Sequence, residues 1–312
     1  MSDIHNKVTI EAFAKINLTL EILGKRSDGY HNVRSIVMPI DLSDHLELEI
    51  TRGEIGTSVT FVEGLSNKGI CSSGKNLATK AARLLKERYR VPHGVIINIE
   101  KRIPIGGGLG GGSADAAATL IGLNRLWNLN LSKAALMEVA ADLGCDVPAQ
   151  LHGGAVCVEG RGEIVRSLLP VDVGPIPKMW VVIVNPGVFC STADVYKNYF
   201  CLECLTGEPE IFHNISLLVR NGDVCNIAGL LFNSLQDVVF EHHPVIALLA
   251  ARLREAGATA VLLSGSGASI FALVRDKEHG VGLCRSLANG TWSILTTTLP
   301  DGVMVAHGPL EP

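Results

Sequence analysis

Alternation of hydrophobic and polar residues marks several segments of the chain as expected β-strands. The longest covers residues 8–23, where Ile16, Leu18 and Leu20 share one face and the polar residues between them share the other. This pattern predicts a long strand or a pair of strands. Residues 94–100 are a second clear case, because a branched apolar residue recurs there at every second position.

Capping residues and apolar stripes predict the helical part of the chain. Ser132 is expected to cap a helix that Gly144 ends, and Ser191 to cap a shorter helix. One further helix is expected to begin at about residue 76, and another to end at about residue 127. Two more are expected over residues 243–255 and 276–288. Strands are expected at residues 45–50, 58–62, 179–184 and 292–298, and on both sides of a glycine turn within residues 260–274.

A proline-rich segment divides the chain. Residues 170–177 include three prolines, which interrupt helices and strands alike. We therefore expect an N-terminal domain of residues 1–172 and a C-terminal domain of residues 173–312.

The composition is that of a globular protein. The 312 residues are 47% hydrophobic and 19% charged, which is enough apolar material for a large core. A net charge of −4 and a pI of about 6.2 provide no general positive field of the kind that attracts nucleic acid or anionic membranes. A small-molecule ligand is the better expectation.

The eight cysteines are scattered, apart from Cys201 and Cys204, so no zinc site is expected and reduced thiols favour the cytoplasm. The N-terminal residues lack the apolar core of a signal peptide. No stretch of about eighteen apolar residues is free of glycine or polar breaks, so no membrane span is expected either. Residues 201–212 match no pattern of known function.

The most distinctive stretch is rich in glycine. Six of the seven residues from 106 to 112 are glycine, and a Ser-Ala-Asp-Ala sequence typical of a helix start follows them. A strand, a glycine loop and a helix in this order bring backbone N–H groups and the positive end of the helix dipole to one place. The stretch therefore predicts a site for an anion such as phosphate.

Two known phosphate loops fit the stretch poorly. A Walker A loop needs lysine after its last glycine, whereas Ser113 follows Gly112 here. A dinucleotide fingerprint matches the spacing of Gly106, Gly108 and Gly111, but it also needs a second strand ending in an acidic residue about twenty positions later. A glycine turn without a ligand would be costly, at about 0.5–1 kcal/mol per interior glycine relative to alanine.

The stretch resembles the phosphate loop of the GHMP kinases, a family of small-molecule kinases with the pattern Pro-x-x-x-Gly-Leu-Gly-Ser-Ser-Ser-Ala. Residues 104–114 follow this pattern, with Gly111 and Gly112 in place of its first two serines. One branch of the family carries this glycine variant. The resemblance implies an ATP-binding loop that consists of Pro104, Ile105, Gly106, Gly107, Gly108, Leu109, Gly110, Gly111, Gly112, Ser113 and Ala114.

Two segments near the N-terminus carry the resemblance further. Residues 14–18, with Lys15 and Asn17, and residues 26–31, with Tyr30 and His31, are similar to the opening of one GHMP branch. That branch acts on 4-diphosphocytidyl-2-C-methyl-D-erythritol in the non-mevalonate pathway to isoprenoids. Without the resemblance, a lysine on a strand is usually solvated, and a Tyr-His pair is usually a surface feature, although such a pair can also stack on a base and bond its edge.

Two later segments also have alternative interpretations. Asp146 follows a helix end and could simply bond the amides of a turn. In GHMP kinases, however, an Asp-Val-Pro sequence at this place contains the catalytic aspartate, and residues 152–154 and 160–163 continue the pattern. The Ser-Gly-Ser-Gly sequence at residues 264–267 could be a plain hairpin turn. In the family it lies beside the phosphate loop and faces the substrate phosphates.

The resemblance covers residues 14–274 and implies both a fold and a reaction. The fold is the α+β GHMP kinase fold, with an N-terminal nucleotide-binding domain of the ribosomal S5 domain 2-like type and a C-terminal ferredoxin-like domain. The reaction is phosphorylation of the 2-hydroxyl group of 4-diphosphocytidyl-2-C-methyl-D-erythritol, with ATP as co-substrate. Mg²⁺ is expected with ATP, and Ser113 is the one protein ligand that we can suggest.

Phosphoryl transfer mainly requires positioning and charge neutralisation. By resemblance, Asp146 would accept the proton of the attacking hydroxyl group and Lys15 would neutralise charge beside it. The implied substrate-binding residues are Asn17, Tyr30, His31, Thr192 and Tyr196. We expect a monomer or homodimer. Two alternatives stay open: a kinase of this fold that acts on homoserine or mevalonate, and a nucleotide-binding protein without catalysis.

Overall fold

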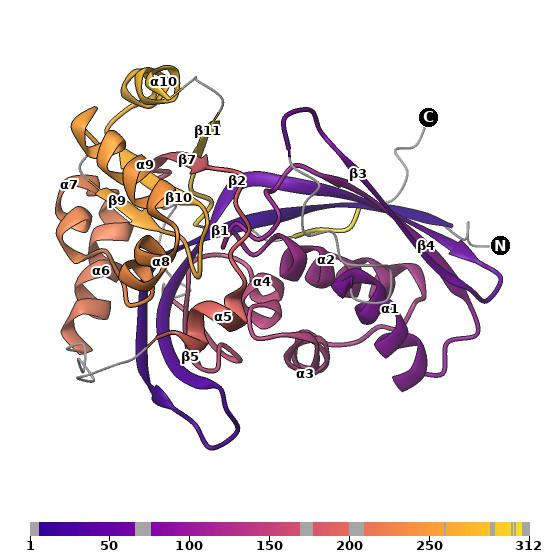
Figure 1. Cartoon of the computed structure of the whole chain (residues 1–312). Helices are drawn as coiled ribbons and strands as arrows, with labels where there is room; N and C mark the ends of the chain where they lie inside the picture. The colour runs from indigo at the N-terminus through magenta and orange to yellow at the C-terminus, as the bar shows by residue number, and fades with distance from the viewer. Residues whose placement is uncertain are drawn as a thin grey trace.

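A long antiparallel hairpin forms the backbone of the fold. Strands β1 (Lys7–Lys25) and β2 (His31–Thr51) pair along nearly their whole length and span both parts of the molecule (Figure 1). The structure, a computed structural model, describes residues 6–65, 76–168, 177–199, 209–258, 260–287, 291–300, 302 and 304–307. The predicted long strand is confirmed, whereas residues 45–50 are the last part of β2 rather than a separate strand.

The hairpin belongs to a sheet that, in the described part of the chain, has seven strands. Its order is β3-β4-β2-β1-β8, and β2 also pairs with β5, which in turn pairs with β6. The bounds are β3 (Ile55–Phe61), β4 (Gly94–Lys101), β5 (Val156–Gly160), β6 (Ile164–Ser167) and β8 (Phe232–Asn233). Strand β3 runs parallel to β4, and β4 runs antiparallel to β2.

Three helices of the N-terminal half, α1 (Leu77–Arg88), α2 (Gly111–Leu126) and α4 (Val147–His152), pack against the sheet, and a fourth, α3 (Lys133–Leu143), packs on these helices (Figure 1). As predicted, Ser132 caps α3 by accepting a hydrogen bond from the N–H group of Ala135. Helix α2 lies unusually close to the sheet, since a Cβ atom on Gly122 would lie 2.7 Å from the side chain of Ile10. The alanine-rich sequence of α2 is therefore a packing requirement.

The C-terminal half contains an antiparallel sheet of order β11-β7-β10-β9 among the described residues. The strands are β7 (Trp180–Asn185), β9 (Ala260–Leu263), β10 (Ile270–Val274) and β11 (Trp292–Thr297), which confirms the four predictions for this region. The helices are α5 (Thr192–Lys197), α6 (Pro209–Asn221), α7 (Val224–Ile227), α8 (Gln236–His242), α9 (Pro244–Glu255) and α10 (Lys277–Ser286), with a 3₁₀ turn at Ala228–Leu230. No helix within the described ranges has the length and apolar character needed to cross a bilayer.

The two halves share a core at the middle of β1. Ile16 and Leu18 pack in one cluster with Ile183 and Phe271 of the C-terminal sheet. Strand β8 of the C-terminal half pairs with β1 in parallel. The polar residues on the other face of β1 are consequently buried as well, although alternation alone would leave them facing water.

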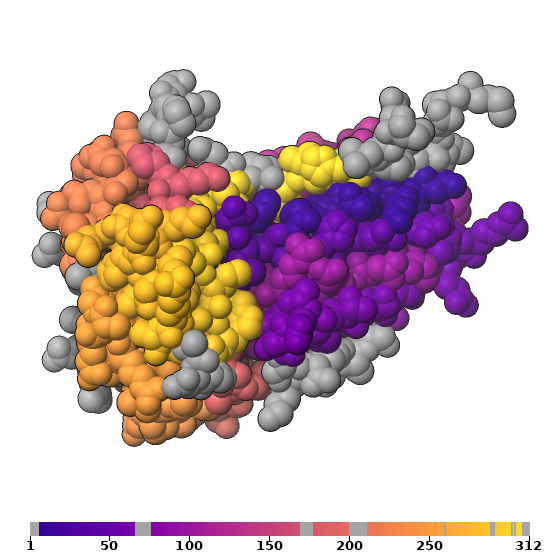
Figure 2. All heavy atoms as spheres, turned by 90° about the horizontal axis from the view of Figure 1, so that it is seen from above, coloured from indigo at the N-terminus to yellow at the C-terminus, as the bar shows by residue number. Residues whose placement is uncertain are grey.

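The end of the chain also returns to the N-terminal half. Met304 and Ala306 belong to the N-terminal core cluster, and His307 forms an isolated bridge with Thr9. Figure 2 shows the yellow C-terminal residues against the indigo N-terminal strands. The predicted boundary between residues 172 and 173 lies outside the described residues, as do Cys201 and Cys204, so the division into two domains stays a prediction.

Candidate active site

A cleft of about 1040 Å³ brings the predicted site residues together. Its lining includes Lys15, Asn17, Tyr30, His31, every residue from 104 to 113, Asp146, Thr192 and Tyr196. Ala114 is the exception, because it is fully buried within α2 and does not face the cleft. Segments from both halves of the chain therefore contribute to one site.

The glycine loop between β4 and α2 has a conformation that requires glycine. Gly106, Gly108 and Gly110 have positive φ angles of 65°, 71° and 71°. A Cβ atom on Gly108 would lie 1.9 Å from the carbonyl oxygen of Ser264, so no larger residue fits there. The loop leads directly into the N-terminus of α2, as the sequence predicted.

The loop is held from the C-terminal half by the turn between β9 and β10. The N–H groups of Ala268 and Ser269 donate to the carbonyls of Gly106 and Gly107 at 3.1 and 3.0 Å, and the hydroxyl of Ser264 donates to the carbonyl of Gly108 at 3.0 Å. These bonds use carbonyl groups of the loop and leave its N–H groups to other partners. The residues 264–267 thus lie beside the loop, as the family resemblance implied.

Lys15 and Asp146 face each other across the cleft. The Lys15 ammonium lies 3.8 Å from Oδ2 of Asp146 and donates to Oδ1 of Asn17 at 2.6 Å. The side chain of Asp146 makes no capping hydrogen bond to α4 and is 55% exposed. Its carboxylate therefore does not serve the turn amides and is accessible to a ligand.

The position of Lys15 follows from an irregularity in β1. The pairing register with β2 shifts between Phe13 and Lys15, which brings Lys15 opposite Pro39. The N–H group of Lys15 donates to the carbonyl of Leu109 at 2.9 Å, and the carbonyl of Pro39 accepts from the N–H group of Leu299 at 2.8 Å. The lysine is thereby tied to the glycine loop.

Burial sets the electrostatics of Lys15. Only 5% of the residue is exposed, and burial lowers the pKa of its ammonium group while the charge of Asp146 opposes that shift. Asn17 is fixed in turn by Ser35, whose hydroxyl accepts from the Asn17 amide at 2.8 Å and donates to the carbonyl of Thr19. The sequence analysis missed Ser35 because it lies on the neighbouring strand, eighteen positions away.

An aromatic group forms another part of the cleft. The ring centroids of His31 and Tyr196 lie 5.5 Å apart, and Tyr199 meets His31 edge-on at 6.5 Å. Burial and the nearby charge of Lys25 lower the pKa of His31, so the neutral imidazole predominates at neutral pH. A neutral imidazole offers one hydrogen-bond donor and one acceptor.

Tyr30 lies at the rim with 51% of its surface exposed, and the guanidinium carbon of Arg161 lies 5.2 Å from the centre of its ring. Thr192 shares a 2.9 Å hydrogen bond with Ser266, which places this threonine beside the 264–267 turn. The sequence analysis included Arg161 in a family pattern but assigned it no role. Its contact with Tyr30 depends on how β5 turns into β6, which the local sequence does not reveal.

The Cys145 thiol lies next to Asp146 in the lining of the cleft. Burial and the charge of Asp146 raise the pKa of the Cys145 thiol, which therefore stays protonated and is a poor nucleophile. Other lining residues that the sequence did not single out include Lys25, Asp28, Lys101, Asp115, Gln150, Phe189 and Lys197. Within the ranges that the structure describes, no three His, Cys, Asp or Glu side chains gather in a way that could hold a metal ion.

Comparison with known proteins identifies the family. The model of the GHMP kinases N terminal domain matches residues 76–154, and the model of the GHMP kinases C terminal matches residues 215–291. The chain is 44% identical over 275 residues to 4-diphosphocytidyl-2-C-methyl-D-erythritol kinases of Bacillus cytotoxicus and Bacillus cereus. Each of these alignments covers 88% of the chain and 90% of the relative.

Solved structures give the same answer for the fold. A crystal structure of a 4-(cytidine 5′-diphospho)-2C-methyl-D-erythritol kinase superposes with a TM-score of 0.71 at 31% identity, covering 93% of this chain and 98% of the other. A homoserine kinase from Cytophaga hutchinsonii has a TM-score of 0.73 at 18% identity, covers 98% of this chain and 99% of the other, and shares the fold. The predicted GHMP kinase fold is confirmed. The chain is a small-molecule kinase that belongs to the GHMP kinases and, within them, to the family of 4-diphosphocytidyl-2-C-methyl-D-erythritol kinases.

Proposed function

We propose that this kinase transfers the γ-phosphoryl group of ATP to the 2-hydroxyl group of 4-diphosphocytidyl-2-C-methyl-D-erythritol, a step of the non-mevalonate pathway to isoprenoid precursors. The observation that carries the proposal is the meeting of three parts in one cleft: the glycine loop, the Lys15–Asp146 pair, and the aromatic group around His31. Membership of the family supports the same activity.

The ATP phosphates would lie against the N–H groups of residues 106–113. The positive φ angles turn successive amides of the loop toward one side, and the dipole of the sixteen-residue helix α2 adds positive potential at its N-terminus. The carbonyl bonds to the 264–269 segment hold these amides in place before ATP arrives. A preorganised site stabilises charge without reorganising during the reaction.

Mg²⁺ would accompany ATP and supply charge neutralisation between the phosphates. The chemistry of the available donors fits a weakly protein-bound ion, because the Ser113 hydroxyl on the first turn of α2 lines the cleft and an all-carboxylate cage is missing from the described residues. Magnesium commonly keeps several waters and takes few ligands from the protein. Ser113 is the residue that we assign to it.

Asp146 would act as the general base. Its exposed carboxylate can accept the proton of the substrate hydroxyl as the oxygen attacks phosphorus. Lys15, whose ammonium lies 3.8 Å from that carboxylate, would attract the charge that spreads over the transferring phosphoryl group. Asn17 and Ser35 hold the ammonium group in this position through hydrogen bonds of 2.6 and 2.8 Å.

The cytosine of the substrate would lie between aromatic side chains. Tyr196 and Tyr30 offer ring faces, and stacking of a base on such a face is typically worth about 1–3 kcal/mol. Neutral His31 can accept from the 4-amino group of cytosine with its unprotonated nitrogen. Asn17 and Thr192 lie toward the rest of the substrate.

The described cysteines are free, which supports the cytoplasm as the location of this monomer or homodimer. The two proposed domains, residues 1–172 and 173–312, would each provide one side of the cleft.

A substrate panel tests the proposed function. Purified enzyme, ATP and Mg²⁺ are incubated with the cytidyl substrate, its uridyl analogue, homoserine or mevalonate, and new phosphomonoesters are detected by ³¹P NMR. We expect product from the cytidyl substrate alone, and a loss of roughly 10²–10⁴ in rate for the near-isosteric variant Asp146→Asn. Equal turnover of the cytidyl and uridyl compounds, or of homoserine, would contradict the assignment.

A further inference from the structure

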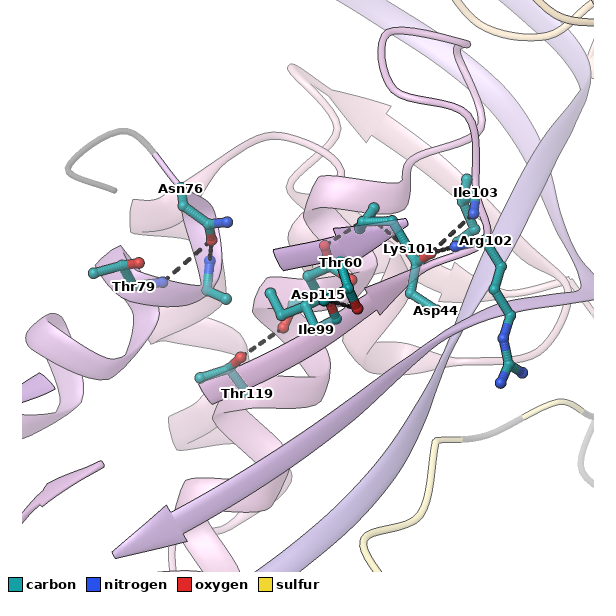
Figure 3. A network of polar contacts seen from close by, with 11 residues as sticks. Asp44, Thr60, Asn76, Thr79, Ile99, Lys101, Arg102, Ile103, Asp115 and Thr119 are labelled. Carbon is teal, nitrogen blue, oxygen red and sulfur yellow. Dashed lines mark hydrogen bonds and ion pairs between the residues drawn. The ribbon is translucent and has the colours of Figure 1, made fainter. Parts of the chain in front are cut away.

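A buried network of three charged side chains lies behind the glycine loop (Figure 3). Lys101 is the last residue of β4, and its ammonium group bonds Oδ2 of Asp44 on β2 and Oδ2 of Asp115 on α2, the latter at 2.8 Å. The exposed fractions of Asp44, Lys101 and Asp115 are only 0%, 5% and 4%. Three elements that surround the loop are therefore joined through one ammonium group.

The same network reaches the entrance of the loop. Oδ1 of Asp44 accepts hydrogen bonds from the N–H groups of Arg102 and Ile103 at 2.6 and 2.9 Å. These two residues lead from β4 into the loop, whereas Asp115 lies just after it, one turn into α2. Asp44 thus holds the entrance, the Lys101–Asp115 bond holds the exit, and the loop spans the distance between them (Figure 3).

The loop packs tightly against the network where it joins α2. A Cβ atom on Gly111 would lie 3.3 Å from the ammonium of Lys101 and 3.0 Å from the side chain of Ile103. The first residue of α2 therefore packs directly on the network. Any movement of Lys101 changes the space in which the loop joins the helix.

Charged side chains are not the most stabilising choice for this buried position. Two carboxylates share one ammonium, and within the described residues Oδ1 of Asp115 has no hydrogen-bond partner. Burial and the charge of Asp44 raise the pKa of Asp115 to about 7, against the opposing effect of Lys101. Well-packed apolar residues are often as stable as such a buried network or more so. A role in geometry explains why charged groups occupy this place.

We propose that Asp44, Lys101 and Asp115 are positioning residues that hold the two ends of the glycine loop at the separation which the ATP phosphates require. This role rests on the proposed use of the loop for ATP. The network bonds residues at the ends of the loop, and although Lys101 and Asp115 also line the cleft, we assign its effect on catalysis to the loop amides. Loss of the network should weaken ATP binding. A saturating concentration of ATP should restore the conformation of the loop and the reaction rate.

The test is Asp115→Asn at pH 8, above the Asp115 pKa of about 7, where the substitution keeps the shape of the side chain and removes its charge. Charge-assisted hydrogen bonds are about twice as strong as neutral ones. We expect KM for ATP to rise about fivefold, equivalent to about 1 kcal/mol, with kcat within about twofold of the wild-type value and KM for the cytidyl substrate unchanged. A purely structural role would instead lower Tm and leave KM for ATP unchanged.

Hydrogen exchange provides a direct readout of the loop. In Asp115→Asn without ATP, a peptide covering residues 103–116 should take up deuterium faster than in the wild type, and ATP should suppress the difference. Glu47→Gln is the matched control, because Glu47 is a carboxylate on the same strand as Asp44 and pairs at 2.7 Å with Lys7 on β1. This control should leave both measurements unchanged.

Lys101→Arg is the alternative test variant if Asp115→Asn does not fold. Arginine keeps the positive charge but changes its geometry. It should raise KM for ATP in the same direction. Titration with ATP alone gives the same comparison without turnover, so an error in the proposed substrate does not affect this test. Wild-type affinity for ATP in either folded variant would overturn the positioning role.

Discussion

Replacing Lys15 with methionine separates charge from packing at the reaction centre. Methionine has a similar length and fills the same apolar space, but it removes the ammonium group beside Asp146. At a separation of about 4 Å, an ammonium and a unit of negative charge on the transferring phosphoryl group interact by about 4 kcal/mol at an effective dielectric constant of 20 and by about 1 kcal/mol in bulk water. The buried ammonium favours the first value, and the 55% exposure of the Asp146 side chain favours the second.

An intermediate value of about 2–3 kcal/mol corresponds to a decrease in kcat of roughly 30- to 150-fold. The assay measures kcat with both substrates saturating, together with Tm. Burial lowers the pKa of Lys15, so the charged form is less favoured in the folded protein than in water, and Lys15→Met should not lower Tm. Lys7→Met is the control, because Lys7 lies on the same strand in an exposed ion pair with Glu47. A folded Lys15→Met variant with kcat within threefold of wild type would refute the role of the charge.

Three further predictions concern the two ligand pockets. Gly110→Val should abolish calorimetric ATP binding, because φ is 71° and a Cβ atom would lie 2.7 Å from the Gln150 amide; unchanged affinity would place the phosphates elsewhere. Tyr196→Ala should weaken binding of the cytidyl substrate roughly ten- to hundredfold and spare ATP, and Tyr196→Phe should be mild; an alanine variant with normal affinity would exclude stacking. KM for this substrate should rise as pH falls through the lowered pKa of His31, since protonation of His31 replaces its acceptor with a donor, and His31→Ala should lack this dependence.

Features with local causes could be predicted from the sequence. Ser132 and Gly144 mark the ends of α3 because capping depends on residues within one helical turn. The glycine loop could be predicted because a strand, several glycines and a helix start follow one another directly. Its assignment to ATP, and that of Asp146 to catalysis, came from the family resemblance, since the residues alone also allowed simple turns.

Features that depend on distant segments could not be predicted. Residues 31–44 show no clean alternation, because the middle of β2 is buried on both faces, and so only its end was expected as a strand. From the sequence alone Lys15 is expected to be solvated, because the C-terminal segments that cover β1 are distant in sequence. Asp44 and Lys101 are 57 positions apart in the sequence. The residues next to each of them do not indicate that its charged side chain is buried.

The hydrogen bonds from the 264–269 segment to the glycine loop have a consequence for the order of events during synthesis. On the ribosome, the loop and α2 emerge long before β9, β10 and the turn between them. Until that turn is made, the carbonyls of Gly106, Gly107 and Gly108 lack their partners. β8, with the two bonds by which Asn233 holds the carbonyls of Leu263 and Gly265, also comes late. A nascent or truncated chain that ends before residue 260 therefore contains the glycine loop but lacks the groups that bond its three carbonyls and hold its conformation.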